Sequence, residues 1–213
     1  TMIAERMGYA ERASASGVER FMKHYYIVAK DVGDLTRIFC AAIEAENMSK
    51  PIIRLPRLRR SLDLMGFQTD RDRLTVADED QFATDPIAMI RLFYVAHNEG
   101  LDIHPHALRL VTQNLKRIDK NLRADPEANR MFVEMATSID TPEMVLTRMN
   151  EAGVFGKFLR DFGRVVGQTQ HDMYHVYTVD EHTIQAIGLL AKIERGELRD
   201  DHPVASEVIH KIS

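Results

Sequence analysis

Imidazole and carboxylate side chains gather in one short stretch near the end of the chain. They are His171, Asp172, His175, Asp180, Glu181 and His182. A hydrolase uses such groups at close range to hold Mn, Mg, Fe or Zn. Two interpretations are therefore open: a metal site, or surface and helix-capping histidines.

The spacing within this stretch bears on that choice. His171 and His175 are four residues apart, so they would share a face if the segment were helical. Gly167 before them and the β-branched run at 176–179 argue against a stable helix there. The residues that follow, Thr178 to Glu181, fit a capping box, which would place His182 in the first turn of a helix.

Other candidate groups are weaker. His97, His104 and His106 include two residues at a predicted helix start, so we expect structural roles for them. The glycines do not have the spacing of a phosphate-binding loop, and no serine has a nucleophile-elbow context. Residue patterns alone predict no catalytic and no cofactor-binding residue.

The composition narrows the classes of partner. Of 213 residues, 45% are hydrophobic and 28% are charged, which is usual for a soluble globular protein. The net charge of −4 and the absence of tryptophan argue against nucleic acid or an anionic membrane as a partner. No apolar run reaches the roughly 18 residues of a membrane span, and no signal peptide is visible, so we expect a cytoplasmic protein.

The single cysteine, Cys40, rules out a disulfide framework within the chain and a cysteine-based zinc site. It lies in an apolar helical stretch, so we expect a small buried side chain. That stretch belongs to a long amphipathic helix predicted from Val18 to Glu46, whose apolar residues recur every three or four positions on one face.

The rest of the chain predicts helices and one small hairpin. Strands are expected at 62–67 and 73–76, joined by a turn at 68–72. Five prolines should open helices, because proline is well placed at a first helical position and a preceding Asp or Thr can cap. These are Pro86, Pro105, Pro126, Pro142 and Pro203. Glycines between 153 and 167 predict a brief helix and then an irregular crossing, our expected subdomain boundary.

A basic cluster lies in the break before the hairpin: Lys50, Arg54, Arg57, Arg59 and Arg60. It is interpreted as a solvated or partner-facing loop, with an anion-binding patch as the alternative. Both ends of the sequence read as helix-like, so we expect both to be cuts within a longer protein.

Longer phrases resemble a known family along nearly the whole chain. They are Met2–Tyr9, Val18–Tyr26, Asp85–Phe93, Leu122–Arg130, Arg148–Val154 and Gln170–Thr183. In this order they resemble the central part of bifunctional PII uridylyltransferase/uridylyl-removing enzymes. The resemblance implies a parent enzyme that moves UMP from UTP onto the PII signal protein and removes it in response to glutamine, with Mg or Mn as its metal.

The same resemblance assigns residues to regions. It implies a central helical domain at 1–167 and the truncated start of an HD-type hydrolase at 168–213. The first metal-ligand histidine of that hydrolase falls on His182, while the paired His-Asp ligands would follow Ser213. The dipeptide His171-Asp172 has the letters of the HD motif, but it precedes the first-ligand position. We therefore interpret it as unrelated to the paired His-Asp ligands.

The resemblance also places the transferase motif before Thr1 and the binding of UTP and glutamine outside this chain. We therefore expect a scaffold that lacks both complete active sites and holds no metal tightly. The fold class expected is mostly α, a multi-helix bundle-like domain with one β-hairpin, plus the first helices of an HD-type all-α domain. The alternative function is a helical protein–protein adaptor.

Overall fold

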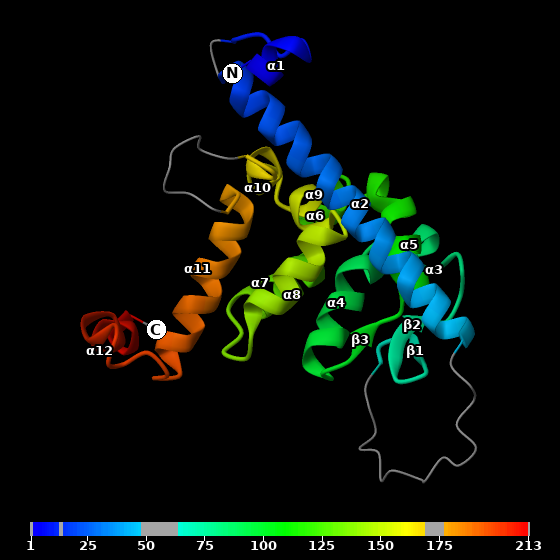
Figure 1. Ribbon diagram of the computed structural model, residues 1–213. Coiled ribbons are helices and arrows are strands. Elements are labelled where there is room, and N and C mark those ends of the chain that lie inside the picture. The colour runs from blue at the N-terminus through cyan, green and yellow to red at the C-terminus, as the bar shows by residue number, and fades with distance from the viewer. Residues whose placement is uncertain (1, 13–14, 48–63, 169–176, 213) are drawn as a thin grey trace.

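The computed structural model describes residues 2–12, 15–47, 64–168 and 177–212 (Figure 1). The fold is mostly α with a small sheet, as expected. From the N-terminus through the third strand, the elements are α1 (Met2–Arg6), α2 (Gly17–Asn47), β1 (Phe67–Asp70), β2 (Arg73–Val76), α3 (Gln81–Thr84), α4 (Ala88–Asn98) and β3 (Asp102–Ile103). Those that follow are α5 (Pro105–Asn114), the 3-10 turn η1 (Leu115–Arg117), α6 (Lys120–Ala124), α7 (Pro126–Ala136), α8 (Pro142–Glu151), α9 (Val154–Phe158), α10 (Arg160–Val165), α11 (Val179–Glu194) and α12 (Pro203–Ile212).

The sheet has the order β1-β2-β3, with an antiparallel pair and a parallel one. Arg71 and Asp72 form the two-residue turn of the hairpin, and both have positive φ, as a type I′ turn requires. The predicted hairpin therefore exists, but its first strand was placed too early. The turn occupies only two residues, so the strand extends through Asp70 instead of ending at Phe67. The pairing with β3 was not predicted.

The core is built around α4. Its Met89, Ile90, Leu92 and Phe93 are completely buried. Helix α4 packs against α7, α8, α3 and β3, so it has neighbours on several sides. Apolar side chains from α7 and α8 complete this core, among them Met131, Met135, Leu146 and Met149.

Prolines open the helices largely as predicted. Helices α5, α7, α8 and α12 begin at a proline, whereas α4 begins at Ala88, two residues after Pro86. Asp125 caps α7 through the Ala128 amide at 2.9 Å. Thr141 makes no such cap because its backbone is left-handed (φ 42°), so the expected Thr cap is wrong.

The long helix α2 forms as predicted but is not buried as predicted. It crosses the molecule beside α5 (Figure 1). Val32, Leu35 and Phe39 are exposed along its second half. Cys40 is exposed as well, so the expectation of a buried thiol is wrong. The apolar face exists, but Val32, Leu35 and Phe39 on it stay exposed even though α2 contacts α1 and α5.

Candidate functional site: the junction of helices α8 and α11

His182 lies in the first turn of α11, and its side chain is exposed. The predicted capping box opens this helix, with the Thr178 amide donating to Glu181 Oε2 at 3.3 Å. His171, Asp172 and His175 lie outside the described residues. Among the residues that are described, no three His, Cys, Asp or Glu side chains come close enough to hold a metal ion.

This geometry sets what the described residues can offer a metal. The exposed imidazole of His182 is accessible as a single ligand, but a stable site needs several. The described part of the chain therefore does not by itself fit a complete metal centre. His182 as a ligand, and the division of the chain at residue 167, stay predictions.

Asp180 holds the start of α11 in place. It is only 3% exposed. Asn150 Nδ2 on α8 donates to its Oδ2 at 2.8 Å, and the Gly167 amide donates to its Oδ1 at 3.0 Å. Burial raises the pKa of Asp180, but hydrogen bonds from Asn150, Thr178 and Gly167 outweigh it, so the net pKa lies below its ordinary value. The carboxylate is thus stabilised in its charged form.

Helix α2 also contacts this junction, because Gly167 lies close to Ile27 of α2. The φ of Gly167 is +66°, and an added Cβ would lie 3.1 Å from Ile27 Cγ1 of α2. In the same region, Lys23 Nζ of α2 donates to the Arg164 carbonyl at 2.8 Å. Three segments far apart in the sequence therefore meet here.

A cavity of about 650 Å³ lies between α2, α8 and α11. Its lining mixes apolar and acidic side chains, including Tyr26, Ile27, Ile184, Glu143, Glu151 and Glu181. One carboxylate oxygen, Glu143 Oε2, is buried without a hydrogen-bond partner. The cavity is negatively charged, so it is unsuited to a phosphate.

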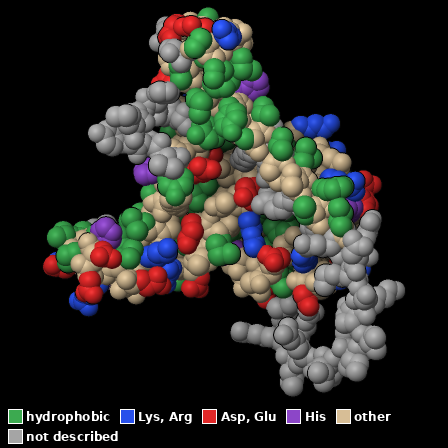
Figure 2. Space-filling model, in the orientation of Figure 1, with side chains coloured by type: hydrophobic (Ala, Val, Ile, Leu, Met, Phe, Trp, Pro, Cys, Tyr) green, Lys and Arg blue, Asp and Glu red, His purple; other side chains and the backbone are tan. Residues whose placement is uncertain are grey.

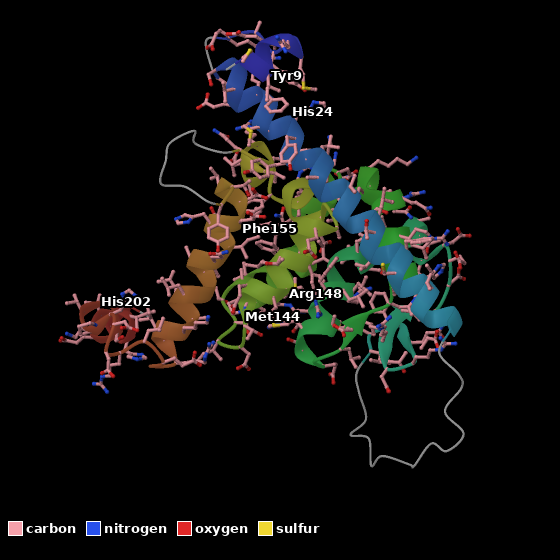
Figure 3. The ribbon with its side chains drawn as sticks, in the orientation of Figure 1. Tyr9, His24, Met144, Arg148, Phe155 and His202 are labelled. Atoms are coloured by element: carbon pink, nitrogen blue, oxygen red, sulfur yellow. The ribbon has the colours of Figure 1, made fainter. Side chains whose placement is uncertain are left out.

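The opposite face of α8 points to the core sheet. Arg148 donates to Asp102 Oδ1 of β3 at 2.5 Å, and it lies on the same face as Met144 (Figure 3). Helix α8 therefore contacts the third strand with one face and α11 with the other. A second set of polar contacts lies at Tyr9 and His24, which are hydrogen-bonded near the start of α2 (Figure 3).

His97, His104 and His106 make structural contacts, as expected. His97 Nε2 lies 2.9 Å from Ser138 Oγ, and His104 Nδ1 accepts from the His106 amide at the start of α5. Burial lowers the pKa of His97 and of His104, although Asp140 and Asp70 respectively act to raise it. His106 pairs with Glu79 at 2.8 Å.

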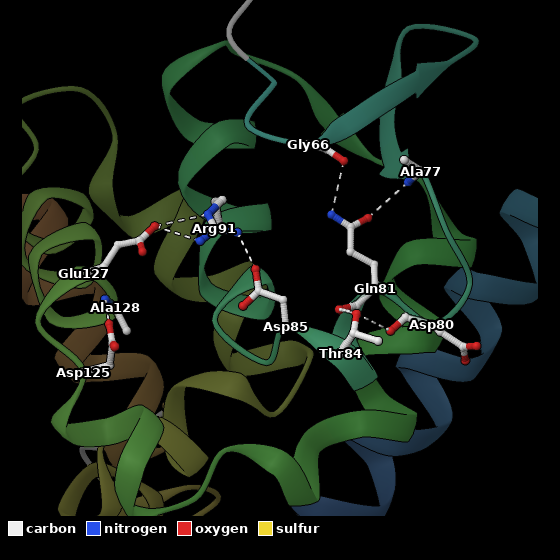
Figure 4. Close-up of polar contacts among 10 residues, drawn as sticks. All are labelled: Gly66, Ala77, Asp80, Gln81, Thr84, Asp85, Arg91, Asp125, Glu127 and Ala128. Atoms are coloured by element: carbon white, nitrogen blue, oxygen red, sulfur yellow. Dashed lines mark hydrogen bonds and ion pairs between the residues drawn. The ribbon is translucent and has the colours of Figure 1, made fainter.

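Arg91 forms the main polar link within the core region (Figure 4). It donates to Asp85 at 2.7 Å and to Glu127 of α7 at 2.8 Å, with its side chain 15% exposed. Burial lowers the pKa of Arg91, but these two carboxylates raise it more, so the net pKa lies above its ordinary value. This network joins α4 to α7 and has no feature of a reactive site.

Sequence reasoning named Asp180 among the groups able to do chemistry but missed its partner. Asn150 was part of a phrase that resembles the family, with no role assigned. A buried asparagine on a helix is a signal that a polar partner faces it. The basic cluster from Lys50 to Arg60 lies outside the described residues.

The fold defines a mostly helical domain with a small sheet and a buried polar junction between α8 and α11, and comparison with known proteins shows its family. Residues 67–158 match the family model "Uridylyltransferase GlnD third domain", and residues 1–40 match "GlnD PII-uridylyltransferase". No solved structure matches this chain.

Two curated relatives match almost the whole chain, and both are named bifunctional uridylyltransferase/uridylyl-removing enzyme. The one from Azospirillum brasilense is 58% identical over 215 residues, covering 100% of this chain and 23% of its own length. The one from Rhodospirillum rubrum is 52% identical over 211 residues, covering 99% and 22%. The chain belongs to this family and spans less than a quarter of the length of these relatives.

Proposed function

We propose that this chain is the central helical part of an enzyme that adds UMP to the PII signal protein and removes it in response to glutamine. The observation that carries the proposal is the 58% identity to a bifunctional uridylyltransferase/uridylyl-removing enzyme over the whole chain. In this proposal UTP and glutamine bind to other parts of the enzyme, which works in the cytoplasm. No described helix is both long enough and apolar enough to cross a membrane.

The role of this region is positional. Helix α2 lies largely in the part matched by one family model, and α8 lies in the part matched by another. Helix α11 follows both and packs on α8. A rigid junction between the three can hold separate active sites at a fixed distance and carry a change of state from one to another.

His182 is proposed as the first metal ligand of an HD-type hydrolase. If such a site held Mg²⁺ or Mn²⁺, the chemistry the metal would supply there is a lowered pKa of bound water, and His182 would be one of the residues that hold it. The chain's own contribution is to present the His182 imidazole from a capped first turn that is fixed to α8. The remaining ligands are expected outside these 213 residues.

A Mn²⁺ titration tests the proposal. A full-length enzyme of this family that carries these 213 residues should bind Mn²⁺, and His182→Ala should weaken that binding. His202→Ala is the matched control, because His202 is exposed near the start of α12. Unchanged Mn²⁺ affinity in His182→Ala, or tight binding of one ion by the 213 residues alone, would contradict the assignment.

A helical adaptor is the second candidate, favoured by the exposed apolar side chains of α2. If α2 binds a separate protein, then Leu35→Asp in the full-length enzyme should abolish that complex and leave uridylylation unchanged. Loss of uridylylation together with the complex would favour the enzyme role for this helix.

A further inference from the structure

The contact between α8 and α11 has a defined register. Asp180, Ile184 and Gly188 recur every four residues, so they share one face of α11. Asp180 meets Asn150 near the end of α8, while Gly188 meets Glu143 near its start. The two helices therefore run antiparallel, with a polar contact at one end and a close approach at the other.

The close approach depends on the missing side chain of Gly188. An added Cβ would lie 2.8 Å from the Glu143 side chain. Between the two ends, Ile184 is 3% exposed and belongs to the main core cluster. Apolar packing thus holds α11 against α8, but such packing is weakly directional and tolerates small shifts.

The hydrogen bonds at the Asp180 end fix the orientation of the two helices. Asn150 Nδ2 of α8 donates to Asp180 Oδ2 and the Gly167 amide donates to its Oδ1, while Thr178, at the start of the same helix, donates a further bond. The Asn150 and Gly167 donors are buried with it, and a buried donor that loses its acceptor is costly. Any rotation or slide of α11 against α8 would break at least one of these bonds.

We propose that Asp180 is a positioning residue that fixes the first turn of α11, and the His182 that it carries, relative to α8. The bond from Asn150 joins the region matched as the third domain to a helix beyond that match. The bond from Gly167 ties the same carboxylate to the segment that touches α2. The part of this inference that concerns His182 rests on the proposed function, whereas the helix clamp stands on the contacts alone.

The chemistry of the pair allows a rescue experiment. Asn150→Asp replaces a donor with a second carboxylate, so two like charges face each other in a buried place. Adding Asp180→Asn reverses the pair. The new amide on α11 can donate to the carboxylate introduced on α8, while its oxygen still accepts from the Gly167 amide. The exchange restores both bonds with almost no change in volume.

The measured quantity is the distance between two spin labels, in a Cys40→Ser background so that labelling is specific. Cysteines replace Ala186 of α11 and Val133 of α7, which are both exposed. The unaltered junction should give one narrow distance distribution. Asn150→Asp should broaden or shift it, and the reversed pair should return it to the original.

Asp161→Asn is the control, because this carboxylate is exposed and pairs only locally with Arg164 in the contacts described; it should leave the distribution unchanged. If Asn150→Asp does not fold, Asn150→Ala removes the amide alone and is expected to broaden the distribution. A narrow, unshifted distribution in a folded Asn150 variant would overturn the proposal. So would a reversed pair that stays as broad as Asn150→Asp.

A second measurement separates this inference from the proposed function. In the full-length enzyme, Asn150→Asp should weaken Mn²⁺ binding about 10-fold or more, as loss of supporting contacts does at metal sites, and the reversed pair should restore it. If His182→Ala leaves Mn²⁺ binding unchanged, the metal assignment fails while the spin-label result still decides the clamp. If His182→Ala weakens binding but Asn150→Asp does not, the positioning role fails instead.

Discussion

Helices α4 and α2 carry apolar residues at the same helical spacing but meet opposite surroundings. In α4, Leu92 and Phe93 are 0% exposed. In α2, Leu35 and Phe39 are 67% and 65% exposed, and Figure 2 shows apolar side chains along the surface of this helix. The spacing of apolar residues therefore indicates which face of a helix can be buried, but not whether a neighbour is there to bury it.

The neighbours explain the difference. Helix α4 lies between α7, α8, α3 and β3, whereas the main contacts of α2 are with α1 and α5. The first half of α2 is partly covered, with Phe21 against Tyr9 at a ring separation of 5.6 Å. Exposed apolar side chains begin at Tyr25 and continue along the second half, where Leu35 and Phe39 are the most exposed.

The largest expected effect is on stability. Phe93→Ala in α4 should lower the free energy of unfolding by about 3–5 kcal/mol, because it removes a fully buried ring and leaves a cavity. Phe39→Ala in α2 is the matched control and should change it by no more than about 0.5 kcal/mol. Urea denaturation measures both. Equal losses would show that the α2 face is covered in solution.

A smaller effect is expected from the polar link between α4 and α7. Arg91→Met should lower the free energy of unfolding by about 1–3 kcal/mol, because two carboxylates lose a charged donor while the apolar stem is replaced. Arg130→Met breaks an exposed i,i+4 pair with Glu134 and should have a much smaller effect. If Arg130→Met lowers the free energy of unfolding as much as Arg91→Met does, the predicted difference between the exposed and the buried ion pairs is wrong.

His97, in the last turn of α4, predicts a dependence of stability on pH. Burial lowers its pKa in the folded state below the ordinary 6.5. The contribution of His97 to the free energy of unfolding is therefore fully present above its ordinary pKa. It is lost as the pH falls through the lower folded-state pKa, because the unfolded chain binds the proton first. Between about pH 7.5 and about pH 5.5, His97→Gln should lose stability less steeply than the unaltered protein. Parallel curves would contradict this role.

The smallest perturbation concerns Cys40 on α2. Its exposed thiol should react with a disulfide reagent in the folded protein nearly as fast as in urea, because no packing shields it. An Ala96→Cys variant provides the contrast, since Ala96 of α4 is 3% exposed and a thiol there should react only on unfolding. Slow labelling of Cys40 in the native state would show that a second molecule or segment covers this face.

Local signals predicted much of the fold. The capping box at Thr178 to Glu181 and the prolines at the starts of α5, α7, α8 and α12 are confirmed, because caps and proline act through the backbone of their own segment. The hairpin was found but misplaced. The parallel strand β3 was missed because two residues carry no periodic signal, and only pairing with β2 makes them a strand.

The candidate site was less predictable. The metal-ligand role of His182, taken from its phrase, stays a prediction, whereas its position in the first turn follows from the capping box and is confirmed. The contact of Asp180 with Asn150 joins residues thirty positions apart. A local sequence pattern cannot predict a contact over thirty positions. The contact exists only because α11 packs on α8.

By itself the sequence determined the helical class, the helix starts and membership of the uridylyltransferase family, since these depend on local backbone chemistry and on long ordered matches. Tertiary structure alone decided which apolar faces are buried, that Cys40 is exposed, and that Asp180 hydrogen-bonds to Asn150 of α8 and to Gly167. Burial and pairing depend on which elements come together in space. A residue's own neighbours in the chain do not carry that information.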